Sequence, residues 1–198
     1  MFYLRKGQLP IFFVNLFYLL IFLFVFSSRR NYEFLSYIGV VVFFSVVILM
    51  TNKKVKYPNS VLWGLTLWGA MHMSGGGILL NAGTMRLYEL ILIPLSEEYG
   101  IFRYDQLVHI IGFGVSTLLM FSLLKPKLKE MKGFSLWLVI VMAGLGVGAM
   151  NEIIEFSVTI FVKNTGVGDF TNTSLDLIAD LLGGILAAIW IKRKKGNI

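Results

Sequence analysis

The sequence lacks cysteine altogether, so it can form neither disulfide bonds nor thiolate metal sites. It is also poor in charge: 15% of its 198 residues are Asp, Glu, Lys or Arg, compared with about 25% in an ordinary soluble domain. In contrast, 57% of the residues are hydrophobic and the mean hydropathy is +0.76. These values exclude an ordinary soluble domain and indicate a multi-pass membrane protein.

The net charge of +7 does not indicate a nucleic-acid-binding protein. Such binding needs a basic face on a soluble surface, whereas here the Lys and Arg residues lie in short segments between apolar runs. We therefore expect the lipid bilayer, and not nucleic acid, as the main partner.

Six apolar segments are long enough, or nearly so, to cross a bilayer, which requires about 20 mostly apolar residues. They are 9–26, 35–50, 61–80, 105–124, 134–161 and 174–191. The second segment is short and the fifth is long, which allows tilt or partial re-entry. Runs of this length are typical of helices rather than barrel strands. The expected fold is an all-α polytopic bundle that forms a single integral membrane domain over residues 1–198.

The distribution of basic residues predicts the direction of the helices. Only five of the 18 Lys and Arg residues fall on the side opposite the N-terminus, namely Arg29, Arg30, Arg86, Arg103 and Lys163. Basic residues accumulate on the cytoplasmic side of membrane proteins. Both termini are therefore predicted to be cytoplasmic.

The longest connection on the predicted outer side, residues 81–104, contains MRLYELILIPLSEEYG. Its apolar core is too short to cross a bilayer. We expect either an interfacial helix at about 84–96 or a loop folded against the outer surface of the bundle.

Seven ionisable residues remain in the spans once the loop charges are set aside. They are His72, Asp105, His109, Glu152, Glu155, Asp176 and Asp180. A helical rise of about 1.5 Å per residue places all seven roughly 18–33 Å from the cytoplasmic end of their spans, in the outer half of the membrane. No Lys or Arg lies within the six segments. Because charged side chains are costly in lipid, we expect these groups to face one another.

Six of these residues form three pairs with helical spacing: Asp105 with His109, Glu152 with Glu155, and Asp176 with Asp180. Residues three or four positions apart share one face of a helix. His72, on the third span, adds another group at a similar height. The pattern predicts one polar site shared by four helices.

Several of these residues also have a purely structural explanation. Asp105 opens a helix, where acids stabilise the helix dipole, and Thr173 to Asp176 fits a capping pattern. The two glutamates could lie beyond the membrane boundary, and either histidine could be a hydrogen-bonded core residue. Asp180 lies deeper and has no such explanation. Taken together the cluster favours function, because ionisable residues inside membranes are usually functional.

A cluster of carboxylates in a dry pocket needs protons, a metal ion or a cationic ligand to balance its charge. Histidine with carboxylates suits Zn, Mn or Fe(II), and carboxylates alone suit Mg or Ca. A metal here would act as a Lewis acid or activate water, with Glu152, Glu155 or Asp180 as candidate catalytic residues. No H-E-x-x-H motif is present. A proton or cation pathway would use the same groups, but the inner halves of the spans lack matching polar residues.

Four motifs resemble those of YjdF-like inner-membrane proteins: HMSGG at 72–76, YDQLVHI at 104–110, NEIIEF at 151–156 and GDFTNTSLDLIADLLGG at 168–184. The resemblance covers roughly the C-terminal two-thirds of the chain. VanZ-like proteins are similar more distantly, with a comparable D-x-x-x-H, a following glutamate helix and a final D-L-x-A-(D/N)-x-x-G helix. The YjdF-like pattern often has Asp-Thr where this chain has Asn172-Thr173, so Asn172 would be the weaker metal ligand.

The resemblance implies a location in a bacterial-type plasma membrane and supports the Asp/Glu/His residues as one unit. VanZ-like proteins are associated with teicoplanin resistance and hence with the cell envelope. The leading hypothesis is an outward-facing pocket that binds a metal or cation and binds or modifies an envelope lipid or a small cationic ligand. The alternatives are a proton-coupled or cation transporter, and a structural or partner-binding membrane protein without catalytic activity.

Overall fold

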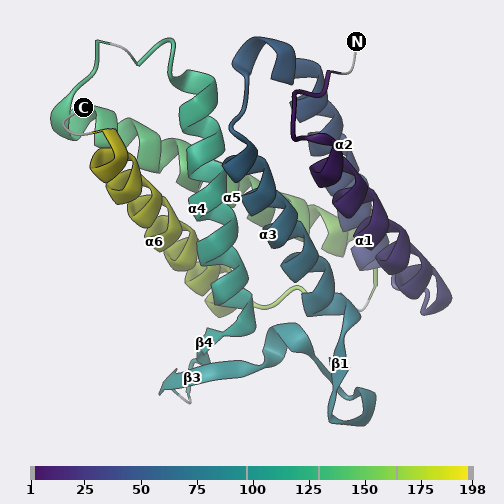
Figure 1. Cartoon of the computed structure of the whole chain (residues 1–198). Coiled ribbons are helices and arrows are strands. Elements are labelled where there is room, and N and C mark those ends of the chain that lie inside the picture. Colours follow the sequence, from purple (N-terminus) through teal and green to yellow (C-terminus); the bar gives the residue numbers. More distant parts are fainter. Residues whose placement is uncertain (1–2, 97, 129, 164, 196–198) are drawn as a thin grey trace.

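The computed structural model describes residues 3–96, 98–128, 130–163 and 165–195 (Figure 1). Helices dominate this part of the chain: α1 (Leu9–Ser28), α2 (Tyr32–Val55), α3 (Asn59–Gly77), α4 (Tyr104–Leu124), α5 (Gly133–Phe161) and α6 (Phe170–Lys195). They pack into one bundle, in which the start of α1 and the end of α6 lie at the same end (Figure 1). We call this the terminal end, and the opposite end, which carries short strands, the strand end.

Five of the helices are long and apolar enough to cross a membrane: α1, α2, α4, α5 and α6. The second was expected to be short, but α2 has 24 residues. The Asn31 side chain caps its start by accepting a hydrogen bond from the Phe34 amide at 3.2 Å, and the helix continues through the polar residues TNKKV. Hydropathy alone misses both polar extensions.

The more polar helix α3 is not among the five. Its 19 residues span about 28 Å at a rise of 1.5 Å per residue, close to the hydrocarbon thickness of a bilayer. It runs along the bundle between α1 and α4 (Figure 1). The all-α membrane bundle is therefore confirmed, whereas six crossings and cytoplasmic termini stay predictions.

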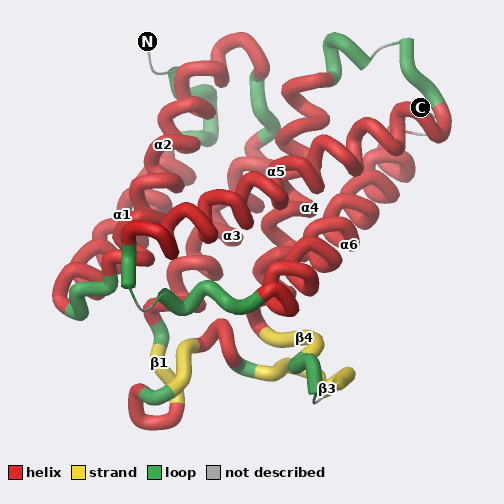
Figure 2. The backbone as a smooth tube through the Cα atoms, turned by 180° about the vertical axis from the view of Figure 1, so that it is seen from behind, coloured by secondary structure: helices red, strands yellow, loops and turns green. Residues whose placement is uncertain are grey.

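Helix α5 crosses its neighbours obliquely (Figure 2). Its 29 residues span about 43 Å, which exceeds the ~30 Å hydrocarbon layer. A tilt lets a helix of this length fit the layer, and it carries the end of α5 to the strand end near α1 and α2.

The connection between α3 and α4 forms two small antiparallel pairs of strands (Figure 2). They are β1 (Leu79–Leu80) with β2 (Met85–Arg86), and β3 (Ile91–Ser96) with β4 (Ile101–Arg103), with the 3-10 turns η1 (Asn81–Gly83) and η2 (Leu87–Glu89) between them. The interfacial helix expected at 84–96 is therefore wrong, and the strands are an addition to an otherwise all-α fold. Ile91, Ile93 and Pro94 explain the difference, since β-branched residues favour extended backbone and proline interrupts a helix.

The bundle buries several charged side chains and exposes many large apolar ones. Asp176 and Asp180 have no exposed surface, whereas Phe17, Phe24 and Phe161 are 69%, 75% and 86% exposed. A soluble protein shows the reverse distribution. Lipid around the bundle explains it, because large apolar side chains are stable there and charged ones are not.

Helices α4 and α6 approach so closely that their backbones touch. A Cβ atom at Gly183 would overlap the backbone of Ile110 and Gly114. Small residues permit this kind of contact between membrane helices, and the contact fixes the register of the two helices that carry most of the buried polar residues.

We expect Gly183→Ala to lower the free energy of unfolding by about 1–3 kcal/mol, because the added methyl group must push α4 and α6 apart. Thermal unfolding in detergent would measure the loss. Gly146→Ala is the matched control, since no atom lies within 4 Å of where its Cβ would be, and its stability should be unchanged or slightly higher. Equal stability of the two variants would contradict the backbone contact.

Candidate metal centre

Helices α4, α5 and α6 bring six of the seven predicted site residues together near the strand end. They are Asp105, His109, Glu152, Glu155, Asp176 and Asp180. The first turns of α4 and α6 meet the last turns of α5 at this end, so the three pairs converge as their helical spacing predicts. His109, Asp176 and Asp180 are buried, and the other three are partly buried.

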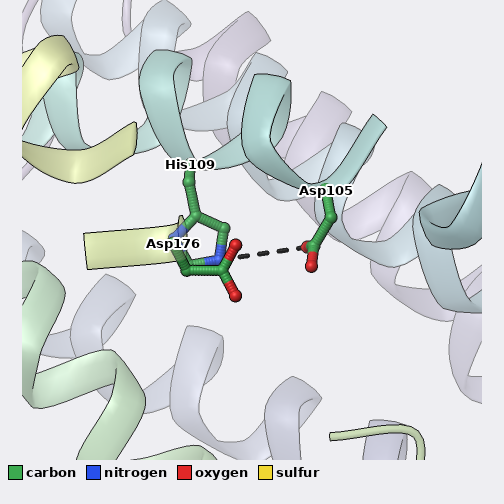
Figure 3. A group of neighbouring side chains, drawn as sticks. All are labelled: Asp105, His109 and Asp176. Atoms are coloured by element: carbon green, nitrogen blue, oxygen red, sulfur yellow. Dashed lines mark ion pairs between the residues drawn. The ribbon is translucent and has the colours of Figure 1, made fainter. Parts of the chain in front are cut away.

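His109 is the central residue of the cluster. Its Nδ1 atom lies 2.9 Å from Oδ1 of Asp180 on α6. Its Nε2 atom lies 3.9 Å from Oδ1 of Asp105 on α4, and Figure 3 shows this pair together with Asp176. Asp180 accepts the hydrogen bond from Nδ1–H. This arrangement leaves the lone pair of Nε2 available as a ligand, in the way that a carboxylate fixes the tautomer of a metal-binding histidine.

Two overlapping groups of donor atoms could hold one ion. The first consists of Asp105, His109 and Asp176, and the second of His109, Glu152 and Glu155. Within each group, one donor atom from every residue lies within 4.8 Å of the others. Ligands bonded at about 2.1 Å to one ion lie about 3 Å apart, so small side-chain adjustments would complete either set. An imidazole with several carboxylates suits Zn, Mn or Fe(II).

Three buried carboxylate oxygens have no hydrogen-bond partner among the described residues: Oε1 of Glu152, Oδ1 of Asp176 and Oδ2 of Asp180. No Lys or Arg in that part of the chain forms an ion pair with the six residues. A buried charged group without a partner is strongly destabilising. The donor set therefore fits a cation both in its chemistry and in the charge that it leaves unbalanced.

Comparison with known proteins identifies the family of the chain. Residues 9–197 match the family model described as "Predicted membrane protein (DUF2238)". The chain belongs to this family. No curated protein and no solved structure matches it. The match confirms the broader part of the resemblance, membership in a membrane protein family, while the similarity to YjdF-like and VanZ-like proteins stays a resemblance.

Two asparagines of this DUF2238 protein orient the carboxylates. Asn172 donates to Oδ2 of Asp176 at 2.6 Å, and Asn151 donates to Oε1 of Glu155 at 2.8 Å. Asn172, considered from the sequence as a weaker metal ligand, is therefore a hydrogen-bond donor to an acid of the cluster. Asn151 was not considered from the sequence, although it lies four residues before Glu155 within NEIIEF.

His72 does not join either donor group. Its ring lies among the rings of Phe34, Tyr37, Trp68 and Tyr88, with centroid distances of 5.5–6.0 Å. The Tyr88 hydroxyl lies 2.5 Å from Nδ1 of His72 and 3.0 Å from its carbonyl oxygen. Burial raises the pKa of Tyr88 well above its usual range, so this hydroxyl stays neutral. The structure thus gives His72 the surroundings of a packed, hydrogen-bonded histidine.

Tight contacts between helices block the cluster of six residues on the side that faces the terminal end. A Cβ at Gly148 of α5 would overlap the Asp180 carboxylate, and one at Gly144 would overlap Thr117 of α4. The Thr117 hydroxyl is already used, because it donates to the Phe113 carbonyl at 2.6 Å. The helices thus leave little space for a polar path between the cluster and the terminal end, which favours access from the strand end.

Tyr88→Phe should lower the free energy of unfolding by about 1–3 kcal/mol, because it removes both contacts of the hydroxyl with His72 inside an aromatic layer. The measurement is thermal unfolding in detergent. Tyr99→Phe serves as the control, since Tyr99 is 51% exposed. If both variants unfold at the temperature of the original protein, the hydroxyl does not anchor His72.

Proposed function

We propose that this protein is an integral membrane metalloprotein that holds one divalent cation between α4, α5 and α6. The observation that carries the proposal is the set of buried, unpartnered carboxylate oxygens in the cluster that contains His109. Zn, Mn or Fe(II) fits the mixed donor set best, and Mg fits if the carboxylates dominate.

The residues around His109 would have different roles. Asp105 and Asp176 would complete one ligand set, while Glu152 and Glu155 would complete the other. Asp180 would be a positioning residue, because its hydrogen bond to Nδ1 orients the imidazole.

The proposed ion would supply a Lewis acid for a carbonyl or phosphoryl oxygen, or lower the pKa of bound water. A glutamate that is not needed as a ligand can hold or accept a proton as a general base. Glu152 suits this role, because its Oε1 has no partner among the described residues, whereas Glu155 is held by Asn151. The proposal therefore assigns the general base to Glu152.

The proposed setting is the outer face of a bacterial-type plasma membrane. Thirteen of the 18 basic residues fall on the side of the termini, so the positive-inside rule assigns the strand end to the outside. The acidic cluster lies near that end. An outward-facing metal centre would act on or bind a molecule of the cell envelope.

A proton-coupled or cation transporter is the alternative that uses the same residues. It would need a polar path through the rest of the bundle. The contacts at Gly144, Gly148 and Gly183 bring the helices together between the cluster and the terminal end, and leave little room for such a path. A structural role without a metal would require His109 to be protonated between Asp105 and Asp180. The unpartnered oxygen of Asp176 supports the metal over this self-contained arrangement.

Metal analysis of the protein purified in detergent tests the proposal. We expect about one divalent ion per chain, lost by most molecules of Asp176→Asn and Glu155→Gln, because each variant removes a ligand charge. Asp180→Asn should weaken metal affinity about 10- to 100-fold, as expected for a group that orients a ligand. Glu130→Gln, an exposed acid outside the cluster, is the control. Equal, negligible metal in all these proteins would overturn the proposal.

Flux measurements separate the proposed site from a transporter. We expect proteoliposomes under a pH gradient to take up no more Zn²⁺, Mn²⁺ or Mg²⁺ than empty liposomes, because the helices are closed toward the terminal end. Uptake that Asp176→Asn abolishes would instead establish the cluster as part of a transport path.

A further inference from the structure

A second, oppositely charged site lies at the strand end. It is a cavity of about 290 Å³ lined by the α1–α2 turn, the start of α2, the end of α3, strands β1 and β2, and the segment that follows α5. Its basic side chains are Arg29, Arg30, Arg86 and Lys163. We call it the basic pocket.

The basic pocket has an excess of positive charge. Glu33 is its one acidic lining residue, and it is paired with Arg86, whose Nη1 atom lies 3.1 Å from Oε2. The same Oε2 accepts a hydrogen bond from the Gly166 amide at 2.8 Å. The side chains of Arg30 and Lys163 are exposed and have no partner among the described residues. Two cations are therefore free to bind an anion.

These four bases lie on a side of the membrane where bases are few, so their convergence on one cavity indicates a binding site. The side of the membrane opposite the termini has only five Lys and Arg residues, and four of them line this one cavity. Orienting the protein requires few bases on this side, not a cluster. Arginine pairs with the oxygens of a phosphate, as with those of a carboxylate, through two parallel hydrogen bonds, so this cluster suits an oxyanion such as a phosphoryl group.

An apolar groove is lined by residues of α2, α4 and α5, and its residues on α2 lie on the terminal side of those that line the basic pocket. It is a cavity of about 770 Å³. On α2, Tyr32 lines the pocket and Ser36, Gly39 and Phe43 line the groove at intervals of three or four residues. Residues at these intervals lie on one face of a helix, so the two cavities follow the same wall of α2.

The other wall of the groove belongs to α5, and Val162 of the basic pocket directly follows this helix. Val162 lines the basic pocket, while Ile154, Met150 and Gly146 line the groove toward the terminal end. No atom lies within 4 Å of where a Cβ would be at Gly39 or Gly146. These two glycines thus leave open, apolar space in the groove, on the side of the basic pocket that faces the terminal end.

We propose that the basic pocket and the groove together bind a phosphate-bearing lipid. Its phosphoryl group would bind Arg30 and Lys163, with Arg29 and Arg86 beside them, and its hydrocarbon chain would lie in the groove between α2 and α5. Pockets of basic residues at the membrane surface bind anionic lipid headgroups by this chemistry. The basic pocket and the metal centre share no residue, so the inference stands independently of the metal.

Native mass spectrometry of the purified protein tests the inference with three probes: phosphatidic acid, diacylglycerol and inorganic phosphate. We expect phosphatidic acid to bind at least about tenfold more tightly than either of the others, because only this probe offers both a phosphoryl group and a chain. The double variant Arg30→Gln/Lys163→Gln should bind phosphatidic acid about tenfold more weakly. Lys53→Gln/Lys54→Gln, which removes two exposed bases near the terminal end of α2, is the charge-matched control.

Gly39→Phe tests the groove separately. The new side chain fills open space, so the protein should fold normally, bind inorganic phosphate as before and lose affinity for phosphatidic acid. Equal binding of inorganic phosphate and phosphatidic acid, with no effect of Gly39→Phe, would overturn the lipid in favour of a free anion. Unchanged phosphatidic acid binding by the double variant would overturn the site altogether. Metal content measured on the same variants should stay at the original level, which separates this result from the metal proposal.

Discussion

The hydrogen bond between Nδ1 of His109 and Oδ1 of Asp180 is the contact on which the arrangement of the cluster depends. It forms because α4 and α6 touch through Gly183, one turn beyond Asp180 along α6. On the other side, Gly148 of α5 leaves room for the second oxygen of Asp180. Small residues on two helices thus position one carboxylate between them. That carboxylate orients the imidazole and determines which of its nitrogens faces the remaining acids.

A layer of aromatic side chains separates the acids at the strand end from Arg86. Arg86 lies over the Phe34 ring at 5.8 Å and is held by Glu33. Beyond Phe34 come the rings of His72 and Trp68, and Trp68 lies 6.4 Å from Phe113, which contacts His109. If Arg86 reached the acidic cluster, an ion pair would neutralise it and remove its affinity for a cation. The layer allows two sites of opposite charge to persist in one small bundle.

Local spacing explains which parts of this structure could be predicted from the sequence. The pairs Asp105–His109 and Asp176–Asp180 each lie on one helix, so a helical period is enough to place them on one face. The hydrogen-bond partner of His109 could not be predicted in this way. Its neighbour on α4, Asp105, lies 3.9 Å away, whereas Asp180, 71 residues further along the chain, lies at 2.9 Å. That choice follows from the approach of α4 and α6, which only the folded chain shows.

Other features that could not be predicted from the sequence also depend on contacts between segments that are distant along the chain. His72 has the depth of a site residue, yet the Tyr88 hydroxyl from the connecting segment contacts its ring. Neither of the alternatives for this segment, an interfacial helix or a surface loop, predicts that contact. The four bases of the basic pocket come from the α1–α2 turn, β2 and the segment after α5. In the sequence they are scattered loop charges, and nothing in their spacing predicts that they converge.

The exposed fractions of its side chains indicate from which side the cluster is accessible. The Asp105 side chain, at the start of α4, is 18% exposed, whereas that of Asp180, farther from the strand end, has no exposed surface. The cluster thus opens at its Asp105 side and is closed by glycine contacts at its Asp180 side. The basic pocket is also formed at the strand end. Under the two proposals, a lipid phosphate bound to Arg30 and Lys163 would be held at the same end of the bundle as the accessible side of the metal centre.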